Sequence, residues 1–366
     1  MQHLLFTNTC FEDELLFSSM NFIDFFKNSP IHLHLHYLSC LLAKKEETAL
    51  LLFKPNDAYL DTLYKLGLTP PKVAYLEDPS LKNLSNTLDS WGNSSFLTAW
   101  AKENNCVYEM PDLALTKAVH SKEFSFYAGP SLPGGELIYL EKDLISWWQK
   151  TKGPKVLKTP QGSSGKGHFI SKRDDQDLPL ALAFFKANEK PLLAEPWVER
   201  IMDFSSQWKI AKDGSYKYLG ATLCENSPRG VYRGSFTGPE KLLFKENHDL
   251  LEKHLFYANQ AIEKMSTLGF FGHVGIDSMA YKNPINEKIA VHPIVEINAR
   301  KTMGLAAITL HEKLEREEIL HFRYELKPKK ESASFLPEFA IIEGKKNRFQ
   351  ARLLIEKIQR SNPICF

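Results

Sequence analysis

The run His292–Arg300 reads HPIVEINAR and holds residues that could do chemistry together. Side chains alternate between the two faces of an extended strand, so Glu296, Asn298 and Arg300 would share one face while apolar neighbours take the other. A carboxylate and an amide oxygen two residues apart offer hard oxygen ligands to Mg2+, an ion that keeps several waters and shares a nucleotide's phosphates. Arg300 would add a fixed cation. The alternative is an edge strand with a solvated polar face.

A second acid precedes this run. The segment Gly275-Ile276-Asp277 is predicted to lie in a strand that follows the predicted helix His248–Thr267. With Lys282–Lys288 as the connecting turn, this strand and the one that carries Glu296 are predicted to pair antiparallel. Asp277 would then complete the metal site.

A loop rich in glycine and serine, Thr159–His168, joins two short strand-like segments, Lys155–Lys158 and Phe169–Ile170. The pattern predicts a hairpin whose tip exposes backbone N–H groups and hydroxyls, which suit phosphate oxygens. The loop is not a P-loop, because only two residues separate Gly162 from Gly165. It is not a dinucleotide fingerprint either, since a strand rather than a helix follows. A hairpin tip without a ligand is the alternative.

The segment Pro191–Val198 is predicted to be a strand that ends in Glu-Pro-Trp-Val. Pro196 lacks an N–H group and interrupts regular pairing, which leaves neighbouring backbone groups for a ligand. Asp203 follows at the start of the next predicted strand. Farther on, Arg229 and Arg233 stand among glycines and could grip an anionic substrate group. Ordinary surface ion pairs are the alternative for both arginines.

Residues 1–115 alternate short apolar runs, Thr48–Phe53 and Lys72–Leu76, with segments of helical spacing, Asp57–Leu66 and Ser94–Asn104. Such alternation predicts α/β architecture with a parallel sheet. Farther along the chain, a helix is predicted over Lys142–Lys150. A hairpin turn at Lys212-Asp213-Gly214 is predicted to join strands Phe204–Ala211 and Tyr216–Cys224.

Three histidines, His32, His34 and His36, would share one face of an extended segment. Such a row could ligate a metal. A half-buried strand is the preferred interpretation, because Leu33 and Leu35 alternate with the histidines and no cysteine or carboxylate is interleaved.

The composition is that of an ordinary globular protein, with 43% hydrophobic and 25% charged residues among 366. The net charge of +2 implies no global attraction to nucleic acid or to membranes. The five cysteines are widely spaced and include no CxxC pair, which argues against a disulfide framework and for a reducing compartment. Acidic residues near the start argue against a secretory signal. These cysteines are Cys10, Cys40, Cys106, Cys224 and Cys365.

With these segments assembled, the chain resembles the ATP-grasp superfamily over roughly residues 121–312. The likeness rests on four segments in the family's order: Val156-Leu157-Lys158 before the Gly-Ser-Ser-Gly-Lys-Gly loop, Glu195-Pro196-Trp197-Val198, Gly275-Ile276-Asp277, and Glu296-Ile297-Asn298-Ala299-Arg300.

The resemblance implies a mixed α/β and α+β fold. An N-terminal α/β domain of the pre-ATP-grasp kind would cover 1–115 and be followed by a two-subdomain ATP-grasp domain at 116–330. The small subdomain would span about 121–198 and the large one about 199–330. Residues 331–366 are predicted to form a C-terminal extension, a strand and a helix, packed on the large subdomain.

The resemblance also implies a role for each matching residue. Two lysines would contact the ATP phosphates, a loop would close over the β- and γ-phosphates, an acid and the backbone after it would hold the adenine edge, and Asp203 would take the ribose hydroxyls. The positions are Lys122 and Lys158 for the phosphates, Gly162, Ser163, Ser164, Gly165, Lys166 and Gly167 for the loop, and Glu195, Trp197 and Val198 for adenine.

The implied metal ligands are Asp277, Glu296 and Asn298. They would bind one or two Mg2+ ions, for which Mn2+ could substitute. Arg300 is expected to neutralise the transferring phosphoryl group. Arg229 or Arg233 is expected to steady the acyl intermediate, because the arginine that some peptide-forming members place two residues before the first metal acid is replaced here by Gly275.

The activity that follows from the resemblance is an ATP-dependent, ADP-forming ligase that joins a carboxylate to an amine, or to a thiol, through an acyl phosphate. One alternative within the fold is other phosphoryl transfer, by a bicarbonate-activating carboxylase-like enzyme or a small-molecule kinase. The other is a nucleotide-binding regulatory protein without turnover. The expected partners are small-molecule carboxylate and amine substrates and, in a homodimer, a second copy of the chain, with no nucleic acid and no membrane. The expected compartment is the cytoplasm.

Overall fold

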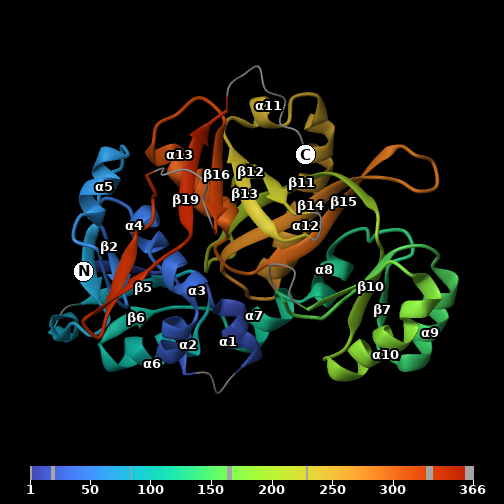
Figure 1. Ribbon diagram of the computed structural model, residues 1–366, viewed down its shortest axis with the longest axis horizontal. Helices are drawn as coiled ribbons and strands as arrows, with labels where there is room; N and C mark the ends of the chain where they lie inside the picture. Colours follow the sequence, from blue (N-terminus) through green and yellow to red (C-terminus); the bar gives the residue numbers. More distant parts are fainter. Residues whose placement is uncertain are drawn as a thin grey trace. The chain divides into compact units, whose positions relative to one another are not determined.

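A computed structural model of the chain describes residues 2–17, 21–83, 85–162, 167–227, 230–326 and 333–358. These residues divide into two compact units, which Figure 1 shows as ribbons. The first unit gathers the described parts of Met1–Leu113, Arg233–Leu243 and Arg300–Pro363, and the second those of Ala114–Tyr232 and Phe244–Ala299. Among the described residues no helix is long and apolar enough to cross a bilayer.

The first unit contains a five-stranded sheet in the order β4-β2-β1-β5-β6, with every neighbouring pair parallel. This confirms the predicted α/β architecture and parallel sheet, and the apolar runs at 48–53 and 72–76 supply β2 and β4. Leu4, Leu50 and Leu88 of adjacent strands are all buried in one cluster. The strands are β1 (Gln2–Phe6), β2 (Glu47–Leu51), β4 (Lys72–Tyr75), β5 (Asn86–Ser90) and β6 (Cys106–Tyr108).

Short helices connect these strands. The segments predicted as helical at 57–66 and 94–104 form α5 and α6. Helix α6 begins after Ser94, whose Oγ accepts a hydrogen bond from the Leu97 amide and so satisfies one of the free N–H groups of the first turn. The helices of this segment are α1 (Phe11–Leu16), α2 (Phe22–Asn28), α3 (Pro30–Leu35), α4 (Leu38–Leu42), α5 (Tyr59–Lys65), the 3-10 helix η1 (Pro79–Asn83) and α6 (Ser95–Glu103).

The prediction of a strand through the three neighbouring histidines is wrong, because the segment forms α3. Proline at the first helical position fixes a helical φ and lacks only an N–H that has no partner inside the helix. The helix sends the side chains to separate partners: His32 to Thr9 Oγ1, His34 to Tyr324 and Pro337, and His36 to the Thr7 carbonyl. The three imidazoles therefore do not form a common metal site.

The later segments of the first unit add antiparallel strands and two helices. Strand β16 pairs with β13 and with β19, and β17 pairs with β3 and β18. The described part of 331–366 thus forms three strands, not the predicted strand and helix. The elements are β3 (Lys54–Pro55), β13 (Tyr232–Thr237), α11 (Glu240–Leu243), α13 (Met303–Lys313), β16 (Leu320–Glu325), β17 (Phe339–Ile342), β18 (Lys345–Arg348) and β19 (Arg352–Lys357).

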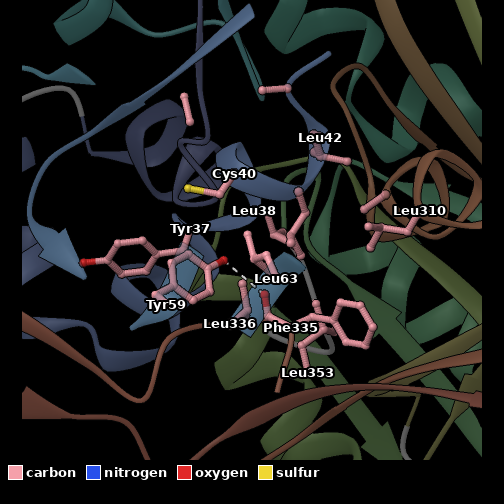
Figure 2. Close-up of a cluster of buried hydrophobic side chains, with 14 of the residues drawn as sticks. Tyr37, Leu38, Cys40, Leu42, Tyr59, Leu63, Leu310, Phe335, Leu336 and Leu353 are labelled. Atoms are coloured by element: carbon pink, nitrogen blue, oxygen red, sulfur yellow. Dashed lines mark hydrogen bonds between the residues drawn. The ribbon is translucent and has the colours of Figure 1, made fainter. Parts of the chain in front are cut away.

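One buried cluster joins the early and late segments of the first unit. Figure 2 shows Tyr59, Leu63 and Leu310 in it, together with Phe335 and Leu353. The hydroxyl of Tyr59 donates to the Phe335 carbonyl at 3.1 Å. Apolar burial on this scale is the main stabilising term of a fold, so residues 333–358 are an integral part of the first unit.

The second unit contains a four-stranded antiparallel sheet in the order β7-β10-β8-β9. The hairpin predicted on either side of the glycine-rich loop is confirmed, with Lys158 opposite His168. Helices α9 and α10 lie beside this sheet in Figure 1, and Trp147 and Trp148 of α9 are buried against it. The elements are β7 (Glu136–Ile138), α9 (Glu141–Lys150), β8 (Lys155–Lys158), β9 (His168–Ser171), η2 (Asp174–Asp177), α10 (Leu178–Ala187) and β10 (Leu192–Pro196).

The second unit also contains four longer antiparallel strands in the order β12-β11-β14-β15. The predicted hairpin at 212–214 and the predicted helix at 248–267 are both present. Helix α12 packs Ile262 and Met265 against Ile276 and Ile297 of the sheet. The elements are α7 (Leu113–Val119), α8 (Lys122–Ala128), β11 (Glu199–Ile210), β12 (Tyr216–Asn226), η3 (Lys245–Asn247), α12 (His248–Thr267), β14 (Gly272–Lys282) and β15 (Ile289–Asn298).

Candidate functional site

The three predicted metal ligands lie together on β14 and β15 of the second unit. Asp277 is directly opposite Glu296, and Asn298 is opposite Gly275. Directly opposite residues of an antiparallel pair project from the same face. The amide Nδ2 of Asn298 donates to Asp277 Oδ2 at 3.1 Å. The predicted antiparallel pairing is therefore present, and it brings two carboxylates and one amide to the same face.

Lys122 reaches this group from the start of α8. Its Nζ lies 2.9 Å from Glu296 Oε1, and the lysine is only 3% exposed. Ser121 caps the helix by accepting from the Phe124 amide, and the Lys122 amide donates to the Pro160 carbonyl just before the glycine-rich loop. Burial raises the pKa of Glu296, but the charge and hydrogen bond of Lys122, with smaller contributions from His120 and His168, together outweigh burial and lower this pKa to about 2. The carboxylate is therefore ionised at neutral pH.

A second lysine and acid form a pair between β8 and β10. Lys158 Nζ lies 2.6 Å from Glu195 Oε2, and the Glu195 side chain is 2% exposed. On the other side, His292 Nε2 lies 3.4 Å from Glu195 Oε1, while its Nδ1 faces the Pro130 carbonyl at 3.2 Å. Burial opposes ionisation of Glu195, yet Lys158 and then His292 hold its pKa well below the ordinary value.

His168, which follows the glycine-rich loop, has a pKa that both lysine–acid pairs influence. It is opposite Lys158 in the β8–β9 hairpin. Burial, followed by the charges of Lys158 and Lys122, lowers the pKa of His168 to about 4, against smaller opposing effects of Glu296 and Glu195. At neutral pH the imidazole is therefore uncharged.

The glycine-rich loop is closed at its base by the backbone. The Thr159 amide donates to the Gly167 carbonyl at 2.9 Å, and Gly167 has a φ of 76°. A Cβ at this glycine would lie 2.2 Å from Thr159 Oγ1, so no larger residue fits without movement. The predicted loop residues Ser163, Ser164, Gly165 and Lys166 lie outside the described residues, whereas Gly162 and Gly167 flank them.

The segment predicted to hold an adenine edge is partly engaged within the fold. The Trp197 amide donates to the Pro154 carbonyl at 2.8 Å. This leaves the Trp197 carbonyl and the backbone of Val198 as the groups that could meet a base. Nearby, Asp203 Oδ2 accepts from Asn226 Nδ2 at 2.8 Å and from Arg200 Nη1 at 3.2 Å.

Of the three predicted catalytic arginines, Arg233 and Arg300 are described by the structure, and neither is among these contacts. In the first unit, Arg300 donates from Nε to Glu12 Oε1 at 2.6 Å and from Nη1 to the Lys301 carbonyl at 3.0 Å. Arg233 is exposed on β13 of the same unit. Arg229 lies outside the described residues. Glu12 is thus the acid that holds Arg300, a partner that the sequence did not indicate.

The donor set of the second unit fits a magnesium nucleotide by its chemistry. In the described ranges no three His, Cys, Asp or Glu side chains gather as a metal site. Two carboxylates and an amide oxygen nevertheless suit Mg2+, because this ion usually takes only one or two protein carboxylates and completes its shell with water and phosphate oxygens. Lys122, which contacts Glu296, and Lys158, which contacts Glu195, carry charges that suit the phosphates themselves.

Known proteins resemble this chain in fold but not in sequence. No protein-family model matches the chain, and no curated protein matches its sequence. Solved structures do match. Phosphoribosylamine–glycine ligase from Thermotoga maritima is similar at 12% identity over 96% of this chain and 90% of that one, with a TM-score of 0.56. The chain has the ATP-grasp fold.

Two further structures with this ATP-grasp fold contain nucleotides. The biotin carboxylase domain of 2-oxoglutarate carboxylase from Hydrogenobacter thermophilus, in complex with MgADP, ADP and bicarbonate, is 13% identical over 98% of this chain and 86% of that one, with a TM-score of 0.53. N5-carboxyaminoimidazole synthetase from Staphylococcus aureus, complexed with ADP, is 10% identical over 89% and 82%, with a TM-score of 0.50. At such identities the likeness establishes the fold alone.

Besides Glu12, the residues that contact or influence the predicted site residues but were not predicted include His168, His292, Arg200 and Asn226. Two of them carried a signal. His168 directly follows the loop, and His292 opens the run that contains Glu296. Arg200 and Asn226 carried none, because their approach to Asp203 depends on the register of the strands.

Proposed function

We propose that this protein is an ATP-dependent, ADP-forming ligase that joins a carboxylate to an amine through an acyl phosphate, with a thiol as the alternative nucleophile. The observation that carries the proposal is the contact of Lys122 with Glu296. It joins a lysine expected to bind phosphate to an acid expected to bind metal, two residues identified from unrelated motifs. Lys158, the other lysine expected to bind phosphate, lies 2.6 Å from Glu195, an acid expected to hold the adenine edge.

Lys122 and Lys158 each have a carboxylate partner within the second unit. Nζ of Lys122 and of Lys158 would exchange or share these carboxylates with phosphate oxygens when a nucleotide binds. The positive charges are thus held in place beforehand and need little reorganisation, which is how preorganised groups favour phosphoryl transfer. This chemistry does not require a nucleophile supplied by the protein.

Asp277, Glu296 and Asn298 would hold Mg2+, one ion or two, with Mn2+ as a substitute. The bound metal supplies charge neutralisation at the transferring phosphoryl group. Arg300 is proposed as a further cation for that group, and Arg229 or Arg233 as the cation that steadies the acyl substrate. The base of the loop at Thr159 and Gly167 would fix where Gly162 and the residues after it approach the phosphates.

A second candidate is activation of bicarbonate in place of an organic carboxylate. One protein of the same fold is described in complex with MgADP and bicarbonate. A carboxylase-like reaction would use the same two lysines and the same metal ligands, so the site residues do not distinguish the two substrates. A small-molecule kinase and a nucleotide-binding regulatory protein are the remaining alternatives.

The decisive experiment is measurement of ADP release from MgATP with pools of carboxylates, one of amino acids, one of other organic acids and one of bicarbonate, each with and without hydroxylamine. ADP together with a hydroxamate in one organic pool establishes carboxylate activation and narrows the donor. ADP release with bicarbonate alone favours the carboxylase-like alternative. No release from any pool by protein that binds MgATP contradicts the ligase proposal and favours a kinase or a regulatory protein.

Lys122→Ala tests the contact between Lys122 and Glu296, and Lys117→Ala is its matched control. Lys117 is five positions earlier in the chain, its side chain is 41% exposed, and its Nζ lies 3.9 Å from Glu189 Oε2. ADP release should fall by roughly two orders of magnitude in Lys122→Ala and remain at the wild-type level in Lys117→Ala. Equal activity in the two variants would remove the main support for the proposal.

A further inference from the structure

The Asp203 carboxylate is fixed by two donors that share one of its oxygens. Arg200 Nη1 lies 3.2 Å from Oδ2 and Asn226 Nδ2 lies 2.8 Å from the same atom. Among the described residues no hydrogen bond to Oδ1 accompanies these two. The carboxylate therefore has one oxygen committed to the protein and one directed elsewhere.

The strand itself brings Arg200 to Asp203. In a regular strand, residues three apart project from opposite faces. The pairing of β11 with β14 shifts register between Arg200 and Met202, which inserts one residue and turns Arg200 to the face of Asp203. Asn226 arrives from β12, two residues beyond Cys224, the direct partner of Asp203. A diagonal neighbour of this kind lies within reach on the same face.

Arg200 is itself held in place by the segment expected to meet the base. Its guanidinium lies over the Trp197 ring, 5.7 Å from the centroid, and its Nη2 donates to the Ser227 carbonyl at 3.3 Å. The side chains of Arg200 and Asp203 are 25% and 17% exposed, so the pair is accessible at one edge. Arg200 thus connects the expected adenine segment to the acid after it.

The charge of this pair decides which ligand would suit it. An isolated aspartate attracts a cation, but Arg200 already neutralises Asp203. A neutralised carboxylate with one available oxygen is a good acceptor for neutral hydroxyl donors and a weak ligand for a metal or an ammonium group. The vicinal hydroxyls of a ribose are donors of this kind.

We propose that Arg200 and Asn226 are positioning residues that aim Asp203 Oδ1 at the ribose hydroxyls, and that the three residues together select ribonucleotides over deoxyribonucleotides. The inference rests on the proposed function, because it assumes that the second unit binds ATP. The two donors would hold the Asp203 carboxylate in a fixed orientation.

The test compares dissociation constants of MgATP, Mg-2′-deoxyATP and Mg-3′-deoxyATP, measured by titration calorimetry on the full chain. Loss of a hydrogen bond to a charged group corresponds to about a 10-fold change or more. The wild type should bind MgATP about 10-fold more tightly than at least one deoxy analogue. In Asp203→Asn, Arg200→Met and Asn226→Ala this ratio should fall to about 3 or less.

Arg200→Met keeps an unbranched stem over Trp197, so a fall in the ratio reports the lost guanidinium rather than lost packing. Arg173→Met is the matched control. Arg173 also bonds an aspartate, Asp177, through Nε and Nη2, but it is 65% exposed and outside the site. In Arg173→Met the ratio of the dissociation constants for the deoxy analogue and for MgATP should equal that of the wild type.

Three outcomes separate the two ideas. Equal affinity of the wild type for all three nucleotides overturns the inference and leaves the proposed function standing. Sugar selectivity that persists in Arg200→Met and in Asn226→Ala overturns the positioning role. No binding of MgATP by folded wild-type protein overturns the proposed function and this inference with it.

Discussion

His34 and His36 of the first unit and His168 of the second have a pKa lowered to about 4, but their surroundings are unlike. Around His34 and His36, burial is the main cause, and the imidazoles meet neutral partners. His36 accepts from the Leu52 amide at 2.9 Å and faces the Thr7 carbonyl. Around His168, the charges of Lys158 and Lys122 add to burial.

The difference teaches how to distinguish a structural histidine from one in a charged site. A core histidine saturates its two ring nitrogens with fixed neutral groups and takes no further part in chemistry. A histidine among paired charges lies where a charged ligand would change the local balance. The three-histidine row suggested chemistry by its spacing, but its members His34 and His36 have structural roles, whereas His168 after the loop has charged neighbours.

The largest expected effect is at Glu296. Glu296→Gln keeps a side chain of the same shape beside Lys122 and removes the negative charge. We expect kcat/KM for ADP release to fall by roughly three orders of magnitude. The melting temperature should also fall, because the buried Lys122 loses its charged partner, but the protein should remain folded at the assay temperature. Steady-state kinetics and thermal unfolding check this together. Activity within tenfold of the wild type would contradict the metal-ligand role and weaken the contrast between the two units.

His36→Ala should lower the stability of the protein and leave its KM for MgATP unchanged. The variant loses two buried hydrogen bonds and leaves a cavity, so the free energy of unfolding should fall by about 3 kcal/mol. The KM for MgATP should stay at the wild-type value in the fraction that remains folded. Urea unfolding measures the first quantity and initial rates the second. A changed KM with unchanged stability would show that this histidine is not structural.

The stability of the protein should also fall in mild acid. The ordinary histidine pKa is 6.5, and in the folded state His34 and His36 have a pKa of about 4. Between these values the unfolded chain binds more protons than the folded one, so protonation favours unfolding. We expect the free energy of unfolding to decrease as pH falls from 6.5 to 4, by about 2 kcal/mol for each histidine.

Urea titrations at pH 7.0, 5.5 and 4.5 measure this decrease. The pKa of Glu296 is lowered, so its contribution is lost only as pH falls below the ordinary glutamate value of 4.5. The interval above pH 4.5 therefore isolates the histidines. His36→Ala should show a shallower slope there, and a slope equal to that of the wild type would refute the assignment.

The smallest expected effect is at the base of the loop. Gly167→Ala places a Cβ 2.2 Å from Thr159 Oγ1 at a φ of 76°. Gly153→Ala is a close control, because Gly153 has a φ of 80° and nothing within 4 Å of the added atom. Both should lose about 1 kcal/mol of stability from backbone strain, and Gly167→Ala should lose more because Thr159 must move. Only Gly167→Ala should raise the KM for MgATP, by several-fold, as measured by initial rates.

The sequence predicted the elements whose determinants are local. Alternating polarity located β15, apolar runs located β2 and β4, and the turn at 212–214 located the β11–β12 hairpin. The order of four short motifs predicted the ATP-grasp fold, which the similarity to solved structures supports. Each of these features depends on neighbours in the chain.

Features that depend on tertiary contacts could not be predicted. The register shift that turns Arg200 toward Asp203 depends on how β11 pairs with β14. The ion pair of Arg300 with Glu12 joins residues 288 positions apart. The helix over the three histidines was missed because alternation of His and Leu fits a strand, while Pro30 at the first helical position favoured a helix.

The bond between Lys122 and Glu296 spans 174 positions of the chain. At synthesis rates of 5–20 residues per second, Lys122 would leave the ribosome roughly 10 to 35 s before its partner. Strand β15 is the last described strand of the second unit, so the paired charges assemble only near the end of that unit's synthesis. A nascent chain would therefore complete the proposed nucleotide site late, and truncation before residue 296 would leave Lys122 without its acid.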